Sequence, residues 1–283
     1  MTISITQLTE HIGARVDGVD LTSPIDNETA EAVLSALYSH SVLVFHGQPI
    51  TDDQHVVFTE SLGPLQMTMV NDPYGGGGPI NVISNVDENG DLIPPDDSRS
   101  LYQAGNTLWH SDGAFKPVPL KASLLSAKEI PPEGGETEFA SMRAAYDALP
   151  EERKVEIEDL VAEHSMAYSR QQIGSGIMDD AWLKATPPAH HPLARTIPET
   201  GEKALLVGAY ASQIVGWPVE KGRKLLEELL VWTTQPEFVY RHEWQDHDLV
   251  IWDNRSAVHR GRPWDNGTYK RIMHRTTLAI DAS

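Results

Sequence analysis

Two short runs of β-branched and large apolar residues constrain the fold most strongly. "SVLVFHG" (41–47) and "DLVIWDN" (248–254) have strand composition, with turn-forming residues at their borders. Three further runs share this character: 203–210, 238–244 and 271–280. The three residues "QDH" (245–247) between two of these runs have the length of a hairpin loop, so we expect the flanking strands to pair. The pattern predicts a protein built largely from short strands.

Helical signals are fewer and fall between the strand-like runs. Thr51 and Gln54 form a T-x-x-Q capping box, and Gly63 and Pro64 end the segment that follows. Helices are predicted at five places: 28–39, 52–61, 142–149, 151–163 and 219–232. Many strands with helices to one side predict an α+β protein built around a β-sandwich or barrel.

The chain reads as one domain over residues 1–283. The glycine-rich run 71–80 is expected to be a long loop, because strand-like residues follow it at once. No stretch approaches ~18 consecutive apolar residues, and residues 1–16 lack the pattern of a signal peptide. The expectation is a cytoplasmic protein without a membrane partner.

Composition limits the chemistry. Because the chain has no cysteine, it can use neither a thiolate nucleophile nor a thiolate metal ligand, and any metal must bind nitrogen and oxygen. The net charge of −19 repels phosphate backbones and argues against a nucleic-acid partner. Lysines and arginines are concentrated in segment 259–275. This concentration indicates either solvated surface charges or a local anion site.

The segment "TLWHSDGAF" (107–115) places His110 and Asp112 two residues apart. If this segment is extended, both side chains point to one face and can converge on one ion. A third ligand could be His259, which follows the run 248–254 after a short connection. Farther along, Arg271 and Arg275 are four residues apart and would share one strand face. Two inward guanidiniums are costly unless anions meet them, which indicates an anionic ligand.

Taken together, these motifs resemble the iron(II)- and 2-oxoglutarate-dependent dioxygenases of the taurine dioxygenase family. The similarity covers nearly the whole chain, in segments 13–21, 41–51, 108–115, 131–150 and 249–265. It implies a double-stranded β-helix, or jelly roll, with flanking helices. It also implies a 2-His-1-carboxylate site that leaves coordination positions open for 2-oxoglutarate and O₂.

The resemblance assigns a role to each candidate residue. It implies that His110, Asp112 and His259 hold Fe(II) as the catalytic centre. Thr137 and Arg271 would bind the distal carboxylate of 2-oxoglutarate. Arg275 would meet the anionic head of the primary substrate, and Asn106 and the backbone of Gly113 would contact that substrate. Relatives are commonly oligomeric, so a homo-oligomer is expected.

The resemblance also implies the reaction, in which 2-oxoglutarate and O₂ yield succinate and CO₂ while an anionic substrate is hydroxylated. Segments 137–150, 237–244 and 252–262 are most similar to the branch that acts on 2,4-dichlorophenoxyacetate. For a phenoxyacetate, hydroxylation beside the ether oxygen would release a phenol and glyoxylate. Tyr210 and Gln213 depart from that branch, and sulfonates, alkyl sulfates and other carboxylates remain alternatives.

Two other classes are weighed against the dioxygenase. A non-redox metal enzyme of the cupin type could use the same three ligands, and a binding protein could carry a metal-free site. Neither has need of Arg271, twelve residues beyond His259. Among the other candidates, we expect His190 and His191 to lie in a loop, and Trp252 to belong to the core. His242 and His274 are expected to have structural or surface roles.

Overall fold

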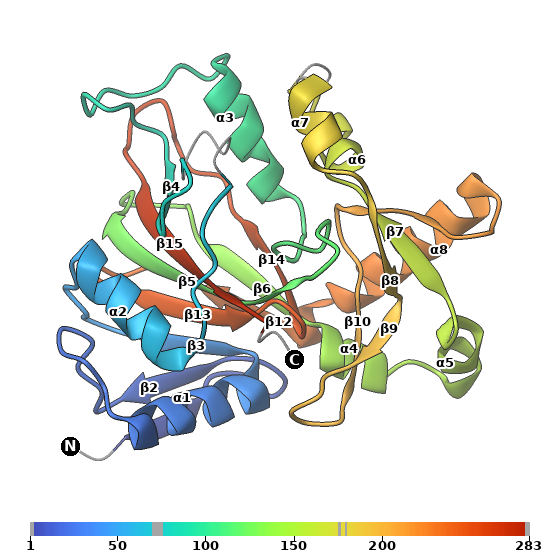
Figure 1. Cartoon of the computed structure of the whole chain (residues 1–283), viewed down its shortest axis with the longest axis horizontal. Coiled ribbons are helices and arrows are strands. Elements are labelled where there is room, and N and C mark those ends of the chain that lie inside the picture. The colour runs from blue at the N-terminus through green and yellow to red at the C-terminus, as the bar shows by residue number, and fades with distance from the viewer. Residues whose placement is uncertain (1–2, 70–75, 175–176, 179, 281–283) are drawn as a thin grey trace.

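The computed structural model describes residues 3–69, 76–174, 177–178 and 180–280. Its centre is a large sheet with a smaller sheet against one face (Figure 1). Helices α1 and α2 cover the other face of the large sheet, while the remaining helices lie beyond the smaller sheet or above the edge of the sandwich. Residues 71–75 of the loop expected at 71–80 lie outside the described residues.

The large sheet has seven strands in the order β1-β2-β3-β13-β5-β15-β4. All neighbours pair antiparallel except β2 and β3, which are parallel. Its strands are β1 (Ser4–Gln7), β2 (Ala14–Asp17), β3 (Val42–Phe45), β4 (Asn81–Ser84), β5 (Leu120–Glu129), β13 (Leu249–Asp253) and β15 (Ile272–Ala279).

Three smaller sheets complete the strands. The order β12-β6-β14 forms the sheet that faces the large one, β11-β7-β8 forms a second, and β10-β9 forms a third. Their strands are β6 (Thr137–Ser141), β7 (Val161–His164), β8 (Ala189–Pro192), β9 (Ala194–Thr196), β10 (Lys203–Leu205), β11 (Ala211–Ile214), β12 (Val239–His242) and β14 (Ala257–Gly261).

The described helices are mostly short. They are α1 (Asn27–His40), α2 (Asp52–Leu62), α3 (Ser98–Gln103), α4 (Met142–Asp147), α5 (Glu151–Ile157), α6 (Met166–Gln171), α7 (Asp180–Ala185) and α8 (Val219–Thr233), with 3₁₀ turns η1 (Ala104–Thr107) and η2 (Pro236–Phe238). The predicted capping box is present, because the Thr51 hydroxyl accepts from Gln54 and the Gln54 side chain accepts from the Thr51 backbone.

Residues alternate along the central strands between two cores. Val42 and Val44 of β3 face the smaller sheet and pack in a cluster with Phe139 of β6. Leu43 and Phe45 face α1 and α2 in a second cluster. Both faces of β3 and β13 are therefore buried, which explains why their sequences are continuous apolar runs rather than alternating ones.

The predicted hairpin between 238–244 and 248–254 is wrong. β12 pairs with β6 in the smaller sheet, whereas β13 lies between β3 and β5 in the large sheet. The connection crosses from one sheet to the other, held by Asp248, whose carboxylate lies 2.7 Å from His46 and 3.0 Å from His242. A short loop can join two strands of one hairpin or two strands in different sheets. Because β13 pairs with β3 along one edge and with β5 along the other, it has no free edge for β12.

Other boundaries also differ. The predicted helix 151–163 ends at Ile157, because the chain from Val161 forms β7 and pairs with β8 and β11. The strand predicted at 203–210 ends at Leu205, where the chain approaches the metal-site segment instead. His190 and His191, predicted in a loop, pair with β7 as part of β8.

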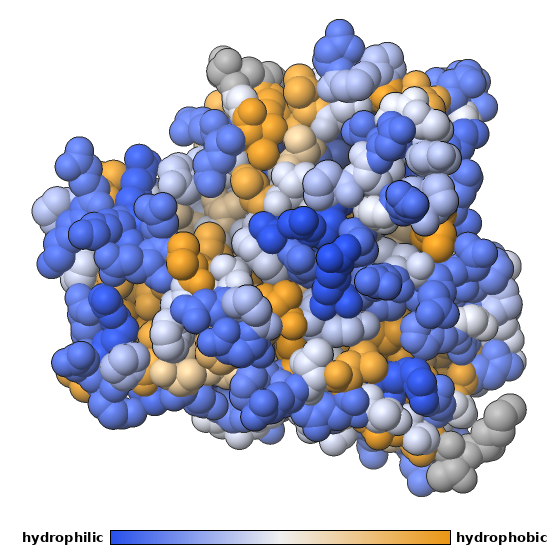
Figure 2. Space-filling view, turned by 180° about the vertical axis from the view of Figure 1, so that it is seen from behind, coloured by the Kyte–Doolittle hydropathy of each residue, from blue (hydrophilic) through white to orange (hydrophobic). Residues whose placement is uncertain are grey.

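Figure 2 shows one face of the molecule, on which hydrophobic residues form small separate groups among hydrophilic ones. None of the helices in the described part of the chain has the length and apolar character that a bilayer crossing needs.

Candidate active site

His110 and His259 are joined by their backbones. The His110 amide donates to the His259 carbonyl at 2.9 Å, and the His259 amide donates back at 2.8 Å. His259 belongs to β14, but His110 forms only an isolated bridge, and the chain turns immediately after it. The expectation that segment 107–115 is extended is therefore wrong at both ends, because Thr107 belongs to the 3₁₀ turn η1 and the chain turns after His110. Gly113 has φ +70°, and a Cβ there would meet Leu120 at 2.4 Å, so the turn requires glycine.

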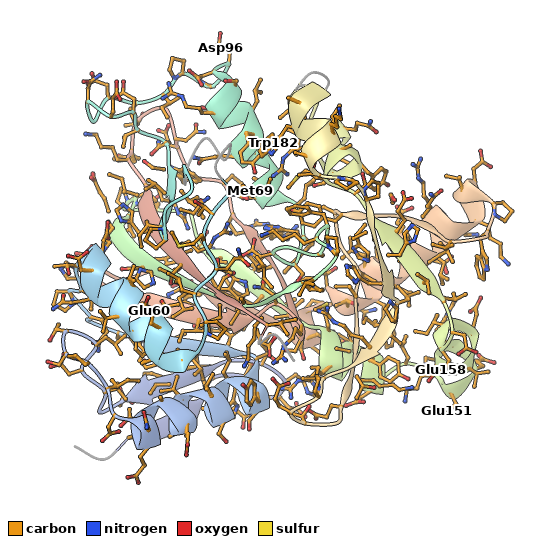
Figure 3. The ribbon with its side chains drawn as sticks, viewed as in Figure 1. Glu60, Met69, Asp96, Glu151, Glu158 and Trp182 are labelled. Carbon is orange, nitrogen blue, oxygen red and sulfur yellow. The ribbon has the colours of Figure 1, made fainter. Side chains whose placement is uncertain are left out.

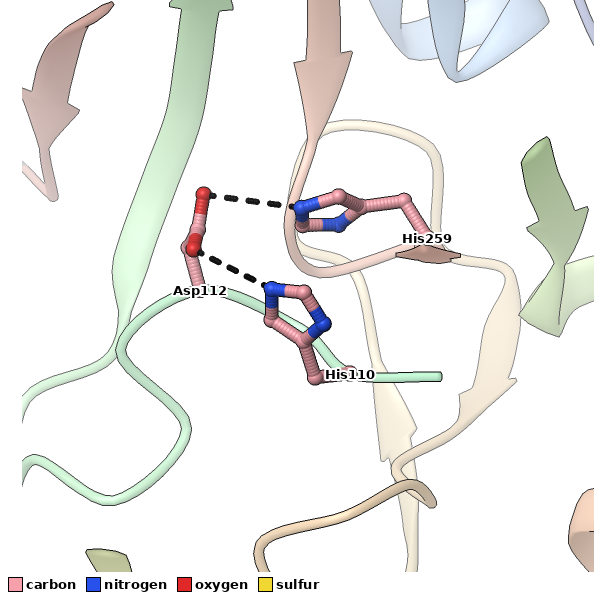
Figure 4. A group of neighbouring side chains, drawn as sticks. All are labelled: His110, Asp112 and His259. Carbon is pink, nitrogen blue, oxygen red and sulfur yellow. Dashed lines mark ion pairs between the residues drawn. The ribbon is translucent and has the colours of Figure 1, made fainter. Parts of the chain in front are cut away.

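Asp112 is brought to the two histidines by this turn rather than by strand alternation (Figure 4). Its Oδ1 lies 3.8 Å from His110 Nε2, and its Oδ2 lies 3.9 Å from His259 Nε2. These distances exceed hydrogen-bond length, so the three groups do not satisfy one another. All three ligand atoms nevertheless lie within 4.8 Å of one another, close enough to share one ion.

Burial sets the protonation of the three side chains. It lowers the pKa of His110 and takes that of His259 well below its usual value, so both imidazoles are neutral at neutral pH. Burial alone would raise the pKa of Asp112, but the Arg275 guanidinium and the two histidines together lower it below its ordinary range. The site thus presents two neutral nitrogens and one carboxylate.

The Asp112 carboxylate is fixed by neighbours outside the triad. Ser123 Oγ donates to Asp112 Oδ2 at 2.7 Å, and Arg275 Nη1 lies 2.9 Å from both carboxylate oxygens. Asn254 accepts from the Asp112 amide at 3.2 Å and from Trp252 Nε1 at 2.9 Å, while its own amide donates to Ser123. These contacts orient a ligand carboxylate in the way that second-layer partners orient metal ligands.

The residues fit a divalent iron ion. A buried set of two imidazoles and one carboxylate on one side of a cavity is the donor set of non-haem Fe(II) oxygenases. The His110 ring is oriented by its Nδ1, which lies 2.7 Å from the Leu108 carbonyl and leaves Nε2 for the metal. Among the described residues, no second cluster of potential ligands has this convergence.

Two cavities meet at the triad. The Arg271 cavity is lined by Leu125, Thr137, Trp252, His259 and Arg271, among others. The Arg170 cavity is lined by Asp112, Phe115, Met166, Arg170 and Tyr210, among others. Residues shared by both are Ile83, Gln103, Asn106, His110 and Arg275. The arrangement provides one compartment for each of two ligands beside one metal.

The lining charges are opposite in sign to the protein as a whole. Asp112 is the one carboxylate among the described lining residues of both cavities. The cations there are Lys116, Arg170, Arg262, Arg271 and Arg275. In a chain with a net charge of −19, this concentration of positive charge favours anionic ligands.

The Arg271 guanidinium is fixed by its neighbours in the Arg271 cavity. Its Nε donates to the Gly135 carbonyl at 3.2 Å, and its guanidinium lies 5.5 Å from the Trp264 ring centroid. Burial lowers the pKa of Arg271 to about 10, so the group stays charged at neutral pH. Thr137 lines the same cavity, and its hydroxyl accepts from Trp244 Nε1 at 3.1 Å.

The structure brings the eight predicted site residues to one region. His110, Asp112 and His259 converge, Thr137 and Arg271 line one cavity, and the three others line the cavity on the far side of the triad or both. Those three are Asn106, Gly113 and Arg275. Of the two positions that depart from the phenoxyacetate branch, Tyr210 lines the Arg170 cavity, whereas Gln213 lines neither.

Sequence reasoning missed several neighbours of the site. Asn254 and Ser123 orient Asp112, and Trp252, predicted as core, is both buried and 4.6 Å ring to ring from His259. Arg170 lies on α6, a helix that was not predicted. The signal for α6 was present, since Ser165 caps it through a hydrogen bond from the Tyr168 amide.

Comparison with known proteins agrees with this geometry. The family described as "Taurine catabolism dioxygenase TauD, TfdA family" matches residues 4–277. An alpha-ketoglutarate-dependent 2,4-dichlorophenoxyacetate dioxygenase of Cupriavidus pinatubonensis is 39% identical over 292 residues, with 98% of each chain covered. An (S)-phenoxypropionate/alpha-ketoglutarate-dioxygenase of Sphingobium herbicidovorans is 36% identical over 285 residues, covering 98% of this chain and 95% of that protein.

The fold has close structural relatives as well. The crystal structure of AAD-2 in complex with Mn(II) and N-oxalylglycine superposes with a TM-score of 0.92 at 44% identity, covering 100% of this chain and 98% of the other. The chain belongs to the taurine catabolism dioxygenase family. The predictions of an α+β jelly-roll fold, of a 2-oxoglutarate-dependent dioxygenase and of its iron, 2-oxoglutarate and O₂ requirement are confirmed.

Proposed function

We propose that this dioxygenase hydroxylates a phenoxyacetate such as 2,4-dichlorophenoxyacetate at the carbon beside the ether oxygen. The resulting hemiacetal collapses to a phenol and glyoxylate, while 2-oxoglutarate and O₂ become succinate and CO₂. The observation that carries the proposal is the pair of cation-lined cavities that meet at the His110, Asp112 and His259 cluster. Relatives that act on phenoxy acids support the choice of substrate.

The three ligands are proposed to hold Fe(II), which supplies the activation of O₂ and the oxidative decarboxylation of 2-oxoglutarate. Asp112 keeps its charge because Arg275 and Ser123 stabilise the carboxylate. His110 and His259 keep their Nε2 lone pairs because burial disfavours protonation. These residues maintain the donor set without any proton transfer at neutral pH.

The Arg271 cavity is proposed to bind 2-oxoglutarate. Arg271 has no carboxylate within ion-pair distance among the described residues, and a distal carboxylate would supply its counter-ion. Thr137, in the same cavity, can donate its hydroxyl to that carboxylate while accepting from Trp244. The two groups fix the cosubstrate at the end away from the metal.

The Arg170 cavity is proposed to bind the primary substrate. Phe115 and Tyr210, whose rings lie 5.1 Å apart, offer apolar surface to an aryl ring. Arg275 is proposed to attract the anionic head next to the metal ligands, and Asn106 and Gly113 complete the wall. Their task is to fix which C–H faces the metal, so positioning is their contribution to the rate.

The test is oxygen consumption by anaerobically iron-loaded protein supplied with 2-oxoglutarate and one candidate substrate. The panel contains 2,4-dichlorophenoxyacetate, other phenoxyalkanoates, cinnamate-like acids, taurine and alkyl sulfates. We expect a phenoxy acid to stimulate uptake, with succinate and phenol formed in equal amounts. Stimulation by a sulfonate or sulfate alone would keep the mechanism and reject the phenoxyacetate assignment.

Two predictions concern the setting of the enzyme. The resemblance predicts a homo-oligomer, and the sequence predicts a cytoplasmic location; both stay predictions. Light scattering on the purified protein checks the first, where a homo-oligomer requires a mass that is a multiple of 31.3 kDa.

A further inference from the structure

Arg170 is a buried cation that the assigned site does not use. It lies on α6 with 5% of its surface exposed, and it lines the same cavity as Asp112 and Tyr210. Its charge acts on His110, whose pKa it helps to lower, and on the Tyr210 phenol. The guanidinium is therefore close to the reacting centre, although α6 is remote from the metal ligands in sequence.

The four arginines buried among the described residues divide into two pairs. Arg143 forms an ion pair with Glu202, and Arg255 forms ion pairs with Asp253 and Glu199. Neither of these arginines lines a cavity at the triad. Arg170 and Arg271 have no carboxylate within ion-pair distance in the described part of the chain, and each lines one of the two cavities.

The surroundings of Arg170 hold its guanidinium without neutralising it. The group lies 4.4 Å from the Tyr102 ring centroid, and Nη1 is 3.4 Å from Ser169 Oγ. The Nε atom is buried without a hydrogen-bond partner among the described residues. Burial opposes the charge of Arg170, but the Tyr210 and Tyr102 side chains outweigh it and raise the pKa of the group, so it stays charged without a carboxylate partner in the described part of the chain. An anionic ligand would supply the missing counter-ion.

The backbone near η1 is shaped around this guanidinium. A Cβ at Gly105 would lie 2.2 Å from Arg170 Nη1 and 2.8 Å from its Cζ. The φ angle of Gly105 is not in the left-handed region, so a Cβ there would not strain the backbone but would displace the Arg170 guanidinium. The position of Arg170 is thus part of how the cavity wall is built.

The other side of this wall is aromatic. Trp182 of α7 reaches toward α3, where its ring centroid lies 5.1 Å from that of Tyr102 (Figure 3). Trp182 and Tyr102 both line the Arg170 cavity. An aryl group bearing a carboxylate would find apolar surface and a positive charge within one compartment.

We infer that Arg170 binds the anionic group of the primary substrate together with Arg275 and is a specificity-determining residue for carboxylates in this cavity. The inference rests on the proposed function, because it takes the Arg170 cavity as the substrate site. Arg275 already has Asp112 as its counter-ion, whereas Arg170 supplies a charge that only the ligand neutralises. Arg170 therefore discriminates a carboxylate from a neutral isostere.

The experiment measures binding by calorimetry on protein loaded with Mn(II) and N-oxalylglycine, which allows binding without turnover. The ligands are 2,4-dichlorophenoxyacetate and its neutral amide, 2,4-dichlorophenoxyacetamide. Arg170→Gln should weaken the acid about 10- to 100-fold, as expected for loss of a charged hydrogen bond, and change the amide less than about 3-fold. Arg170→Lys should bind the acid with an affinity between those of Arg170→Gln and the parent.

Two further variants keep the test sharp. Gly105→Ala retains the arginine but displaces its guanidinium, and should weaken the acid more than the amide. Arg223→Gln is the matched control. Arg223, on α8, lies 4.8 Å from the ring centroid of Tyr168, which is on α6 with Arg170, but it lines neither cavity. It should bind both ligands as the parent does. Binding of N-oxalylglycine should be unchanged in every variant.

The outcomes separate this inference from the proposed function. If the parent binds and converts the phenoxy acid but Arg170→Gln binds it equally well, or loses acid and amide equally, the inference is overturned alone. If the parent binds only an alkyl sulfate or sulfonate, and Arg170→Gln weakens that ligand, the phenoxyacetate assignment fails while anion binding by Arg170 stands. Binding of no anion from the panel overturns both.

Discussion

The two cavities share His110, Asn106 and Arg275, yet their walls are built differently. The Arg271 cavity takes residues from strands of both facing sheets, through Leu125 of β5, Thr137 of β6 and Trp252 of β13, and is closed on one side by α3 and η1. The Arg170 cavity has strands β4, β5 and β15 on one side, and three short helices line the other, through Tyr102 of α3, Arg170 of α6 and Trp182 of α7.

The difference indicates how the enzyme separates its two tasks. Strands buried on both faces hold side chains rigidly, which suits a cosubstrate whose chemistry does not vary. Helical turns and loops at the edge of a scaffold can change without disturbing the sheet, which suits a substrate that differs between relatives. One metal centre therefore serves a fixed compartment and an adaptable one.

The largest effect is expected at the point where the two cavities meet. Asp112→Ala removes a metal ligand and leaves Arg275 without its counter-ion, so turnover should fall to background with every substrate. Succinate formation and circular dichroism check the prediction together. Unchanged turnover in a folded variant would reject the ligand assignment and, with it, the shared centre.

Arg271→Gln should affect one cavity alone. Loss of a charged hydrogen bond to a carboxylate should raise the KM for 2-oxoglutarate about 10- to 100-fold, while iron binding and the affinity for the primary substrate stay near those of the parent. Steady-state kinetics with each substrate varied in turn measures the split. A non-redox metal enzyme or a metal-free binding protein would be indifferent to this change.

Tyr210→Phe should weaken binding of the primary substrate and not that of 2-oxoglutarate, and the effect should be smaller than that of Arg271→Gln. Removing one neutral hydroxyl from the Arg170 cavity should weaken the primary substrate about 3- to 10-fold and leave the KM for 2-oxoglutarate unchanged. Burial raises the pKa of Tyr210 to about 12, so the phenol stays protonated, and the effect should be the same from pH 6 to pH 9. An equal effect on both substrates would contradict the separation of the cavities.

The smallest effect on the site is expected from the scaffold that both cavities share. His55 is buried beneath β15, with Nε2 3.0 Å from Thr276 Oγ1, and burial lowers its pKa to about 3. The unfolded chain therefore binds the proton first, and the free energy of unfolding should fall as the pH drops below 6.5.

This loss should reach about 2 kcal/mol between pH 7 and pH 5 for that single group. Urea unfolding of the parent and of His55→Gln measures the difference, since the variant lacks the titrating group. A pH dependence of equal size in both proteins would show that His55 does not titrate as its burial requires. KM values at pH 7 for both substrates serve as the control and should not change.

The sequence predicted the centre of the site better than its walls. The family resemblance assigned the roles of five residues at the centre of the site: His110, Asp112, Thr137, His259 and Arg271. The physical route was partly wrong, because Asp112 reaches the histidines through a glycine turn and not along a strand. The residues that orient it, Ser123 and Asn254, are ordinary polar residues whose partners only the fold brings near.

The strands were predicted more securely than their pairing. Continuous apolar runs identify β3 and β13, but the loop between β12 and β13 gives no information on whether the chain returns to the same sheet. The helices that wall the Arg170 cavity have six residues each, too short for a periodic pattern to be recognised. The extent of the domain over residues 1–283 stays a prediction.

The most direct test is a crystal structure of the protein with Mn(II), N-oxalylglycine and 2,4-dichlorophenoxyacetate. The account predicts the metal on His110, Asp112 and His259, and the distal carboxylate of N-oxalylglycine on Arg271. The phenoxy acid should lie in the other cavity with its carboxylate on Arg170 and Arg275. N-oxalylglycine bound through Arg170, or both ligands in one cavity, would contradict the division of labour between the two compartments.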